Sequence, residues 1–241
     1  ARILLVTDVN FLLYTPLLPG AAAGSLEPRH VVVPLREELD WTDIRMGRAT
    51  GAAPDRNEVH VHTVDGRDET LRYDQLILTP GSVSRELPVP GLDQHALGFK
   101  TLADAIALRN RLLLNMEIAE SLPDEQARRE YLTVVFVGAG YAGLEGIAEL
   151  QDYAADVIDR YPRCRVAGTR FVLVEAQDRV MQEIPAPLAE FASRELRGRG
   201  MEILTRTMLK EMDERSATLS TGERISCALC AMAINDLGHR A

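Results

Sequence analysis

The clearest pattern in the chain is a run of apolar residues that leads into three glycines. Thr133–Val137 holds five apolar or β-branched residues, and Gly138–Gly143 follows with the spacing G-x-G-x-x-G. Such a run is typical of a central parallel strand that is covered on both faces. The residues after the glycines predict a helix from Ala142 to about Tyr161. A second apolar run, Phe171–Val174, predicts the next strand and ends on Glu175.

This order of strand, glycine loop, helix and strand predicts a unit that binds a dinucleotide. Gly138 allows the tight turn, Gly140 lets backbone amides approach a pyrophosphate, and Gly143 lets the helix pack close to the strand. The start of the helix presents N–H groups and the positive end of its dipole to the phosphates. Tyr141 and Ala142 lie at that start and complete the candidate phosphate-binding set.

Glu175 is the candidate partner of the adenosine ribose. A carboxylate at the end of the second strand accepts hydrogen bonds from both ribose hydroxyls and repels a 2′-phosphate, so it favours NADH over NADPH. The distance along the chain from Gly138 exceeds the roughly 20 residues of the minimal motif. We assign the surplus to the long helix and to an inserted loop over 162–169. The alternative is that Glu175 is a solvated charge at the end of a strand.

The rest of the pattern predicts one more long helix and several short strands. Leu102–Ser121 repeats apolar residues at helical spacing, and Thr101 is typical of an N-cap. Prolines and glycine argue against regular structure over 15–20 and predict an inter-domain connection over 83–98. Residues 124–130 are expected to form a solvated charged loop. The other expected elements are a short helix from 21, a helix at 186–199, and strands at 2–6, 31–33, 60–64, 69–73, 75–78, 202–205, 217–219 and 224–234.

Composition narrows the class of protein. The chain has 241 residues and an apolar fraction of 46%, enough for one large or two small domains with a core. The net charge of −9 argues against nucleic acid as the main partner. Three cysteines are too few for a secreted disulfide scaffold. The sequence shows neither a run of 18 apolar residues nor a signal-peptide pattern. Its first residue is Ala1, which favours a processed chain or a fragment.

Several segments together resemble the type II NADH dehydrogenases, within the FAD/NAD(P)-binding pyridine nucleotide-disulfide oxidoreductase-like superfamily. The match extends over nearly the whole chain, to about Asn235. The glycine loop alone would identify only a nucleotide-binding fold. The segments that carry the resemblance are 10–19, 26–30, 34–36, 73–81, 98–105, 138–150 and 172–179.

The resemblance implies an α/β, Rossmann-like flavoprotein fold with two dinucleotide-binding domains, of which the NAD domain is largely complete. Residues 1–101 would form a partial FAD-binding domain that lacks its first strand, glycine loop and helix. Residues 102–131 would be a connecting helix and loop, 132–235 the NADH-binding Rossmann domain, and 236–241 a tail. The family begins with a glycine loop for FAD and continues beyond its NADH domain. We therefore expect this chain to be truncated at both ends, as a fragment, a processed form or a degenerate copy.

The resemblance also implies an oxidoreductase with FAD and NADH as cofactors. Such enzymes are non-proton-pumping NADH:quinone oxidoreductases of the respiratory chain: they move a hydride from NADH to FAD and pass electrons on to a quinone. Full-length relatives associate with the membrane surface, which implies a cytoplasmic, peripheral location at the inner face of the cell membrane. The resemblance leaves two alternatives for the oligomeric state, a monomer and a homodimer.

Matching positions in the family give a candidate FAD set. A proline-braced loop would lie along the flavin, a second turn would close beside it, and an acid near the N-terminus would hold the FAD ribose. The alternative for the first loop is a plain apolar core segment. The set is Asp8, Thr15, Pro16, Leu17, Thr79, Pro80 and Gly81.

Glu145 is the catalytic candidate, since it matches a family carboxylate near the nicotinamide. There it would orient the nicotinamide or relay protons to the quinone. The alternative is that an acid in the first turn of a helix is stabilised by the helix dipole.

Two further patterns favour structural roles. Cys227 and Cys230 have redox-pair spacing, but they fall in an apolar strand in which positions three apart face opposite sides. His60 and His62 share one face of a strand, yet no third ligand is apparent, so we expect exposed hairpin histidines and no metal site.

Two classes of function remain. One is the flavoenzyme, and the other is an NADH-binding module or fragment without flavin chemistry. Within the enzyme class, another pyridine-nucleotide flavoprotein oxidoreductase is a further alternative.

Overall fold

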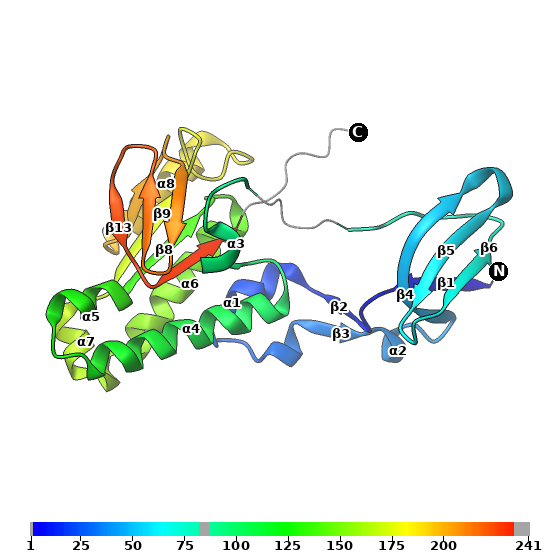
Figure 1. Ribbon diagram of the computed structural model, residues 1–241, viewed down its shortest axis with the longest axis horizontal. Helices are drawn as coiled ribbons and strands as arrows, with labels where there is room; N and C mark the ends of the chain where they lie inside the picture. The colour runs from blue at the N-terminus through cyan, green and yellow to red at the C-terminus, as the bar shows by residue number, and fades with distance from the viewer. Residues whose placement is uncertain (1, 82–86, 234–241) are drawn as a thin grey trace. The chain divides into compact units, whose positions relative to one another are not determined.

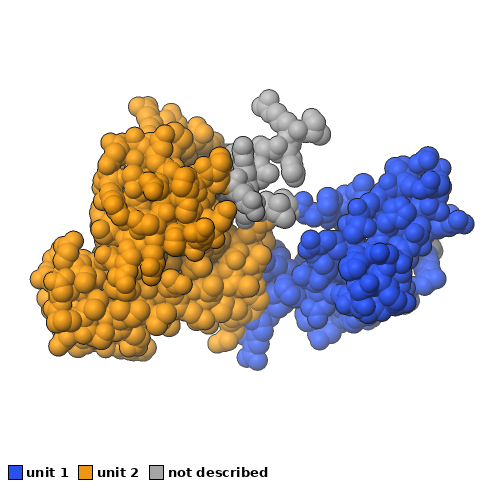
Figure 2. Space-filling model, viewed as in Figure 1, with its two compact units in different colours: residues 1–14, 29–82 blue, residues 15–28, 83–241 orange. Residues whose placement is uncertain are grey.

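The computed structural model describes residues 2–81 and 87–233 (Figure 1). The chain divides into two compact units, coloured separately in Figure 2. Unit 1 comprises residues 1–14 and 29–82, and unit 2 comprises residues 15–28 and 83–241. The segment 15–28 thus packs with the C-terminal unit, although it lies inside the N-terminal domain expected from the sequence. The expected tail, 236–241, lies outside the described residues.

Unit 1 is built on a four-stranded sheet in the order β1-β4-β5-β6, in which β1 and β4 are parallel and the other pairs are antiparallel. β2 and β3 pair separately as an antiparallel ladder. The turn η2 (Pro28–His30) spans the boundary between the units. The elements of unit 1 are β1 (Ile3–Thr7), β2 (Phe11–Leu13), β3 (Val32–Pro34), α2 (Leu35–Glu38), β4 (Thr42–Ala53), η3 (Pro54–Arg56), β5 (Glu58–Thr63) and β6 (Asp68–Arg72).

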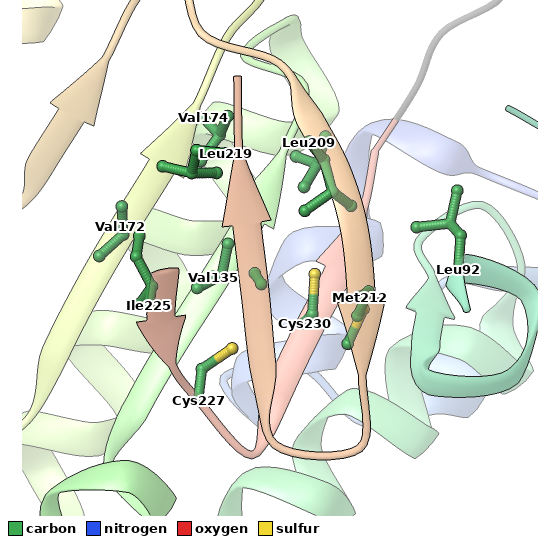
Figure 3. Close-up of a cluster of buried hydrophobic side chains, with 12 residues drawn as sticks. Leu92, Val135, Val172, Val174, Leu209, Met212, Leu219, Ile225, Cys227 and Cys230 are labelled. Carbon is green, nitrogen blue, oxygen red and sulfur yellow. The ribbon is translucent and has the colours of Figure 1, made fainter. Parts of the chain in front are cut away.

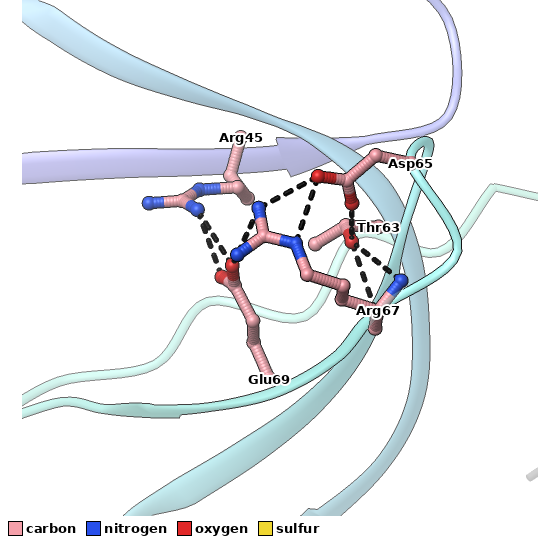
Figure 4. Close-up of polar contacts among 5 residues, drawn as sticks. All are labelled: Arg45, Thr63, Asp65, Arg67 and Glu69. Carbon is pink, nitrogen blue, oxygen red and sulfur yellow. Dashed lines mark hydrogen bonds and ion pairs between the residues drawn. The ribbon is translucent and has the colours of Figure 1, made fainter.

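β5 and β6 form a hairpin that turns through Asp65 and Gly66. An ion-pair network fastens it, as Figure 4 shows: Arg67 lies between Asp65 and Glu69, and Arg45 on β4 also pairs with Glu69. The guanidinium of Arg67 and the hydroxyl of Thr63 donate hydrogen bonds that hold the pKa of the Asp65 carboxyl well below its usual range. The network thus links three strands at the surface of unit 1.

Unit 2 contains a five-stranded, all-parallel sheet in the order β10-β9-β8-β14-β7. A three-stranded antiparallel sheet, β11-β12-β13, accompanies it. The elements of unit 2 are η1 (Thr15–Leu17), α1 (Leu18–Ala23), α3 (Leu92–His95), β7 (Ala96–Gly98), α4 (Leu102–Ser121), α5 (Glu125–Tyr131), β8 (Thr133–Val137), α6 (Tyr141–Val157), η4 (Ile158–Arg160), α7 (Pro162–Ala167), β9 (Arg170–Val174), α8 (Ala186–Gly198), β10 (Glu202–Leu204), β11 (Leu209–Asp213), β12 (Ser216–Leu219), β13 (Arg224–Ser226) and β14 (Leu229–Met232).

One core cluster of unit 2 lies between its two sheets, and a second lies among its helices. Val135 and Val172, from the central strands of the parallel sheet, are buried with Leu219 and Ile225 from the antiparallel sheet, as Figure 3 shows. α4 and α6 pack against the parallel sheet, and the small helix α1 packs against both of them. Because β8 is covered by other elements, every one of its residues is buried, as the continuous apolar run predicts.

The long elements of unit 2 confirm the sequence predictions. α4 spans the expected residues, and Thr101 and Asp104 form a capping box at its start. β8 also has the expected bounds, while α6 begins one residue earlier than predicted and is succeeded by the turn η4.

α1 contains the start of the short helix expected from residue 21 but begins earlier, at Leu18, because Pro19 stands in its first turn, where the missing N–H carries no penalty. Two expected loops, 124–130 and 162–169, are helices instead. α5 is capped by Asp124, the residue before the helix, whose carboxylate accepts a hydrogen bond from the N–H of Ala127. α7 begins at Pro162, and Glu120 on α4 accepts hydrogen bonds from the first N–H groups of that helix.

The predicted strand at 75–78 was wrong, and four strands were missed: β2, β4, β7 and β11. The segment 75–78 has no strand structure, and Ile77 is 85% exposed, since β-branched residues form a strand only beside a pairing partner. The expected connection over 83–98 contains α3 and β7, which pairs with β14 at the edge of the parallel sheet. β11 was also missed, because its sequence, Leu209–Asp213, carries two charged residues at exposed positions.

Candidate functional site

The glycine loop follows β8, the strand at which the order of strands along the parallel sheet reverses direction. β9 and β10 continue on one side of β8, and β14 lies on the other, so β8 borders a topological switch point, the usual place for a ligand. The N–H of Gly138 donates to the carbonyl of Val174 at 2.9 Å and extends the β8–β9 ladder by one step. Gly138 then turns with a φ of +99°, a conformation that favours glycine.

Gly143 allows the helix to approach this turn closely. A Cβ atom at Gly143 would lie 1.9 Å from the carbonyl oxygen of Gly138, so any larger residue would displace the loop. α6 begins at Tyr141, and among the described residues no side chain caps its N-terminus. The N–H groups of Tyr141 and Ala142, which have no partner within a helix, are thus available to an anion such as a pyrophosphate.

Glu175 faces back toward the glycine loop. Its Oε2 accepts a hydrogen bond from the N–H of Ala139 at 2.7 Å, and its Oε1 accepts one from the N–H of Gln177 at 2.8 Å. The carboxylate is thus held by two backbone N–H groups, and its role toward a ribose stays a prediction. A carboxylate has about four lone-pair positions, so two remain for the hydroxyls of a sugar.

The backbone beside Glu175 is fastened on its other side as well. The N–H of Glu175 donates to Leu204 at the end of β10, and its carbonyl accepts from the N–H of Thr207 at 2.9 Å. The carbonyl of Gln177 accepts from the N–H of Arg206, which has a φ of +53°. A non-glycine residue in that region carries a conformational penalty of about 1–2 kcal/mol. The surrounding bonds hold the turn, and with it the position of the carboxylate.

A groove of about 480 Å³ brings a second group of candidate residues together within unit 2. Pro16 and Leu17, from the predicted flavin-contacting loop, line one side, and Glu145 on α6 lines the groove with them. Two more acids of α6, Glu149 and Asp152, also line it, and Arg199 pairs with Asp152. The other lining residues are Pro19, Gly20, Ser25, Leu26, Leu144 and Ala148.

Glu145 is not a first-turn acid of α6, because the helix begins at Tyr141 and its first turn has no acidic residue. Burial raises the pKa of the Glu145 carboxyl above its ordinary value, and the nearby Glu149 carboxylate raises it further. The helix dipole, which acts mainly within the first turn, would lower that pKa. Glu145 is nevertheless an exposed residue, so its pKa is raised by partial desolvation and charge repulsion without full burial of the group.

A family model described as "Pyridine nucleotide-disulphide oxidoreductase" matches residues 1–237, which include both the glycine loop and Glu175. The chain belongs to the pyridine nucleotide-disulphide oxidoreductase family. Membership covers both units and agrees with the resemblance predicted from the sequence.

Curated relatives within this family are NADH dehydrogenases. The chain is 29% identical to a probable NADH dehydrogenase of Dictyostelium discoideum, over 94% of this chain and 52% of that protein. It is 27% identical to the mitochondrial external alternative NADH-ubiquinone oxidoreductase of Yarrowia lipolytica, over 88% of this chain and 38% of that protein. The predicted resemblance to type II NADH dehydrogenases is thus confirmed as a distant homology, and the chain spans about half of these relatives or less.

Solved structures share the fold. The structure of NDH2 from Plasmodium falciparum in complex with NADH matches with a TM-score of 0.90 at 20% identity, over 97% of this chain and 50% of that one. The water-forming NADH oxidase from Lactobacillus brevis bound to NADH matches with a TM-score of 0.74 at 18% identity, over 98% of this chain and 48% of that one. At such identities the likeness establishes the α/β fold with its Rossmann-like parallel sheet.

Although the family is named after a disulphide, the cysteines of this member are free and buried. Cys227 lies between β13 and β14, outside the strand in which the sequence placed it, and Cys230 lies within β14. Both sulfur atoms belong to the core between the sheets, as Figure 3 shows. Burial raises the pKa of Cys227 to about 12 and raises that of Cys230 as well, so both stay protonated, unreactive thiols at neutral pH.

The remaining FAD candidates of this family member belong to unit 1. Asp8 is exposed, and its carboxylate forms an ion pair with Arg48 on β4 at 3.3 Å. Thr79, Pro80 and Gly81 follow the irregular segment 75–78 and are exposed. Gly81 has a φ of +69°, and a Cβ there would meet no atom of the described residues within 4 Å.

Two histidines of unit 1, His60 and His62, make cross-strand contacts. The Nδ1 of His60 lies 3.2 Å from Oγ1 of Thr70, and that of His62 lies 2.8 Å from Oδ1 of Asp68. Within residues 2–81 and 87–233, no three His, Cys, Asp or Glu side chains are grouped as a metal site would require. Over the same residues, no helix combines the length and apolar character needed to cross a membrane.

Sequence reasoning missed the loop that follows Glu175. Met181 donates its N–H to the carbonyl of Ala139 at 2.8 Å, so this loop contacts the glycine loop directly. Met181 also has a φ of +48°. Nothing in the spacing of the apolar residues indicates either property, because both depend on backbone groups rather than on side-chain pattern.

Proposed function

We propose that this chain is the NADH-binding half, with part of the flavin domain, of an NADH:quinone oxidoreductase. The hydrogen bond from the N–H of Ala139 to Glu175, at 2.7 Å, carries the proposal, because it joins the acid to the glycine loop at the switch point of the sheet. Gly138, Gly140 and the start of α6 would take the pyrophosphate, and the free lone pairs of Glu175 would take the ribose hydroxyls.

The close packing of α6 against the glycine loop at Gly143 supports this assignment. The helix approaches the loop so closely that a Cβ would collide with Gly138, and close approach of backbone to ligand is what a pyrophosphate on helix amides needs. Tyr141 and Ala142 present their N–H groups at the same end. The residues present therefore fit a dinucleotide. Glu175 would weaken the binding of NADPH, since its charge repels a 2′-phosphate.

The groove supports the flavin end of the proposal. Pro16 and Leu17 would lie against the flavin, and Thr15 precedes them in the same turn. When bound, NADH and FAD would supply the hydride chemistry, and a quinone would accept the electrons. Glu145 would orient the nicotinamide or hold a proton at its carboxyl for delivery to the acceptor, in line with its raised pKa.

The names of the relatives support the choice of acceptor and location. The Yarrowia lipolytica protein is named as a mitochondrial NADH-ubiquinone oxidoreductase, and so is the second external enzyme of Saccharomyces cerevisiae, to which the chain is 29% identical. By homology we propose a quinone acceptor for the whole protein and a position at a membrane surface. The homodimer stays a prediction.

Calorimetric titration tests this function. NADH and NADPH are titrated separately into the chain 1–241, followed by ADP-ribose, which lacks the nicotinamide. The proposal predicts saturable binding of NADH and ADP-ribose. It also predicts that NADPH binds at least about tenfold more weakly than NADH. Equal affinity for both dinucleotides, or no binding of either, would contradict it.

A second candidate function is an NADH-binding module without flavin chemistry. It is supported by the placement of both the glycine loop and Glu175 within unit 2, where a hydrogen bond of 2.7 Å joins them. The absorption spectrum of the purified chain separates the two functions. Flavin absorption at stoichiometric amount favours the enzyme, and a colourless chain that binds NADH favours the module. Another pyridine-nucleotide flavoprotein oxidoreductase would show flavin reduction by NADH with a different acceptor.

A further inference from the structure

The loop between Glu175 and α8 is organised around one guanidinium group. Nη1 of Arg179 donates to the carbonyls of Met181 at 2.9 Å and Ile184 at 3.1 Å, and a third carbonyl, that of Val180, lies at 3.5 Å. Nη2 donates to the carbonyl of Gln182 at 2.9 Å. All of these acceptors follow Arg179 within five residues, so its side chain folds the segment 179–184 around itself.

This folded segment reaches the glycine loop through Met181. The side chain of Met181 is 9% exposed, and its N–H donates to the carbonyl of Ala139 at 2.8 Å. The N–H of Ala139 donates to Glu175 on the other side. The polar groups of Ala139 are therefore both held from the same loop, one by a side chain and one by a backbone amide.

The left-handed conformation of Met181 depends on this arrangement. A φ of +48° is unfavourable for a methionine, and such a conformation persists only where its surroundings enforce it. The Arg179 guanidinium binds the Met181 carbonyl, and that carbonyl also accepts the N–H of Ile184 at 3.2 Å. Without the guanidinium, the Met181 peptide would lose a charged donor and the turn would relax.

We propose that Arg179 is a positioning residue for NADH. It holds the 179–184 turn, the turn holds Ala139 through Met181, and the glycine loop is thereby presented in the geometry that a pyrophosphate needs. Arg179 makes no contact with the coenzyme in this scheme. The contacts of its two terminal nitrogens go to carbonyls of its own loop, so the scheme gives Arg179 no role toward a 2′-phosphate and leaves the preference for NADH to Glu175. The inference rests on the proposed function.

Calorimetry on three variants tests the inference. Arg179→Ala should weaken binding of NADH and of ADP-ribose about tenfold or more, because the amides at the loop are no longer held in place. Arg179→Lys should weaken both by a similar factor, since an ammonium lacks the planar fork that spans several carbonyls, and it serves where the alanine variant does not fold. Arg128→Ala is the matched control: Arg128 donates to the carbonyls of Ala119 and Leu122, before β8 and away from the loop.

Two readouts separate positioning from general stability. Ethylguanidinium added to the Arg179→Ala variant should restore part of the NADH affinity and leave Arg128→Ala unaffected. Hydrogen exchange should accelerate at the N–H of Met181 in the Arg179 variants, while the N–H of Gly138, bonded to Val174 in the ladder, stays protected. Unchanged NADH affinity in folded Arg179→Lys would overturn the inference. Loss of affinity in Arg128→Ala equal to that in the Arg179 variants would overturn it too.

These outcomes differ from a failure of the proposed function. If the unmodified chain binds neither NADH nor ADP-ribose, the proposed function fails, and the exchange rate at Met181 still reports on the link between Arg179 and the glycine loop. If the unmodified chain binds NADH and both Arg179 variants bind it equally well, only the positioning role fails.

Discussion

The candidate NADH site and the candidate FAD residues differ in how this chain organises them. The residues assigned to NADH lie in unit 2, where the glycine loop and Glu175 are joined by a hydrogen bond of 2.7 Å. Of the residues assigned to FAD, Asp8 and the turn at 79–81 lie in unit 1, exposed, and Asp8 is already paired with Arg48. A site whose parts all follow the C-terminal ends of neighbouring strands in one sheet is pre-organised by that sheet. A site drawn from two units needs their mutual placement as well.

The substitution with the largest expected effect is Gly143→Ala. The new Cβ would lie 1.9 Å from the carbonyl oxygen of Gly138, so the loop or the helix must move. We expect NADH affinity to fall by about 100-fold or more, measured by calorimetry.

Gly198→Ala is the matched control for this change. Gly198 is also helical and lies in unit 2, but a Cβ there would meet no atom within 4 Å. This variant should bind NADH normally. If Gly143→Ala binds NADH as tightly as the control does, the glycine loop is not the phosphate site.

Glu175→Gln should have the next largest effect. The amide keeps one acceptor oxygen, so it cannot accept from the N–H groups of both Ala139 and Gln177 and also from a ribose. We expect about a tenfold loss of NADH affinity and a smaller loss for NADPH, so the ratio of the two affinities narrows. Glu183→Gln, in the same loop and exposed, should leave the ratio unchanged. A constant ratio in Glu175→Gln would remove the ribose role.

Asp8→Asn tests the other side of the comparison. Because Asp8 belongs to unit 1, the change should alter NADH affinity by less than about twofold. If the chain binds FAD, the same variant should bind it more weakly in a titration followed by flavin fluorescence. A strong effect on NADH binding would mean that the two sites are not organised separately.

The sequence predicted the NADH side better than the FAD side for a physical reason. The run Thr133–Val137 and the helix after it carry strong periodic signals, and the structure has both. The segment 75–78 has an equally apolar sequence but no strand, because strand formation depends on a neighbour that local composition does not encode. The contact between Met181 and Ala139 was equally invisible, since it joins two backbone groups.

The smallest expected effect is a pH dependence at Glu145. The folded state raises the pKa of this acid through burial and Glu149, so folding favours its protonated form. The contribution of Glu145 to the free energy of unfolding is therefore greatest at low pH. It declines as the pH rises from the ordinary pKa of about 4.3 toward the raised pKa. Glu145→Gln should remove that decline, seen as a flatter profile of the unfolding temperature between about pH 4 and 7. An unchanged profile would mean that Glu145 is not perturbed.

The crystal structure of the chain with NADH tests the central claim most directly. The account predicts the pyrophosphate against the N–H groups at the start of α6, next to Gly140, and an adenosine hydroxyl within hydrogen-bond distance of Glu175. Density for NADH elsewhere on the molecule, or an adenosine ribose that does not touch Glu175, would contradict it.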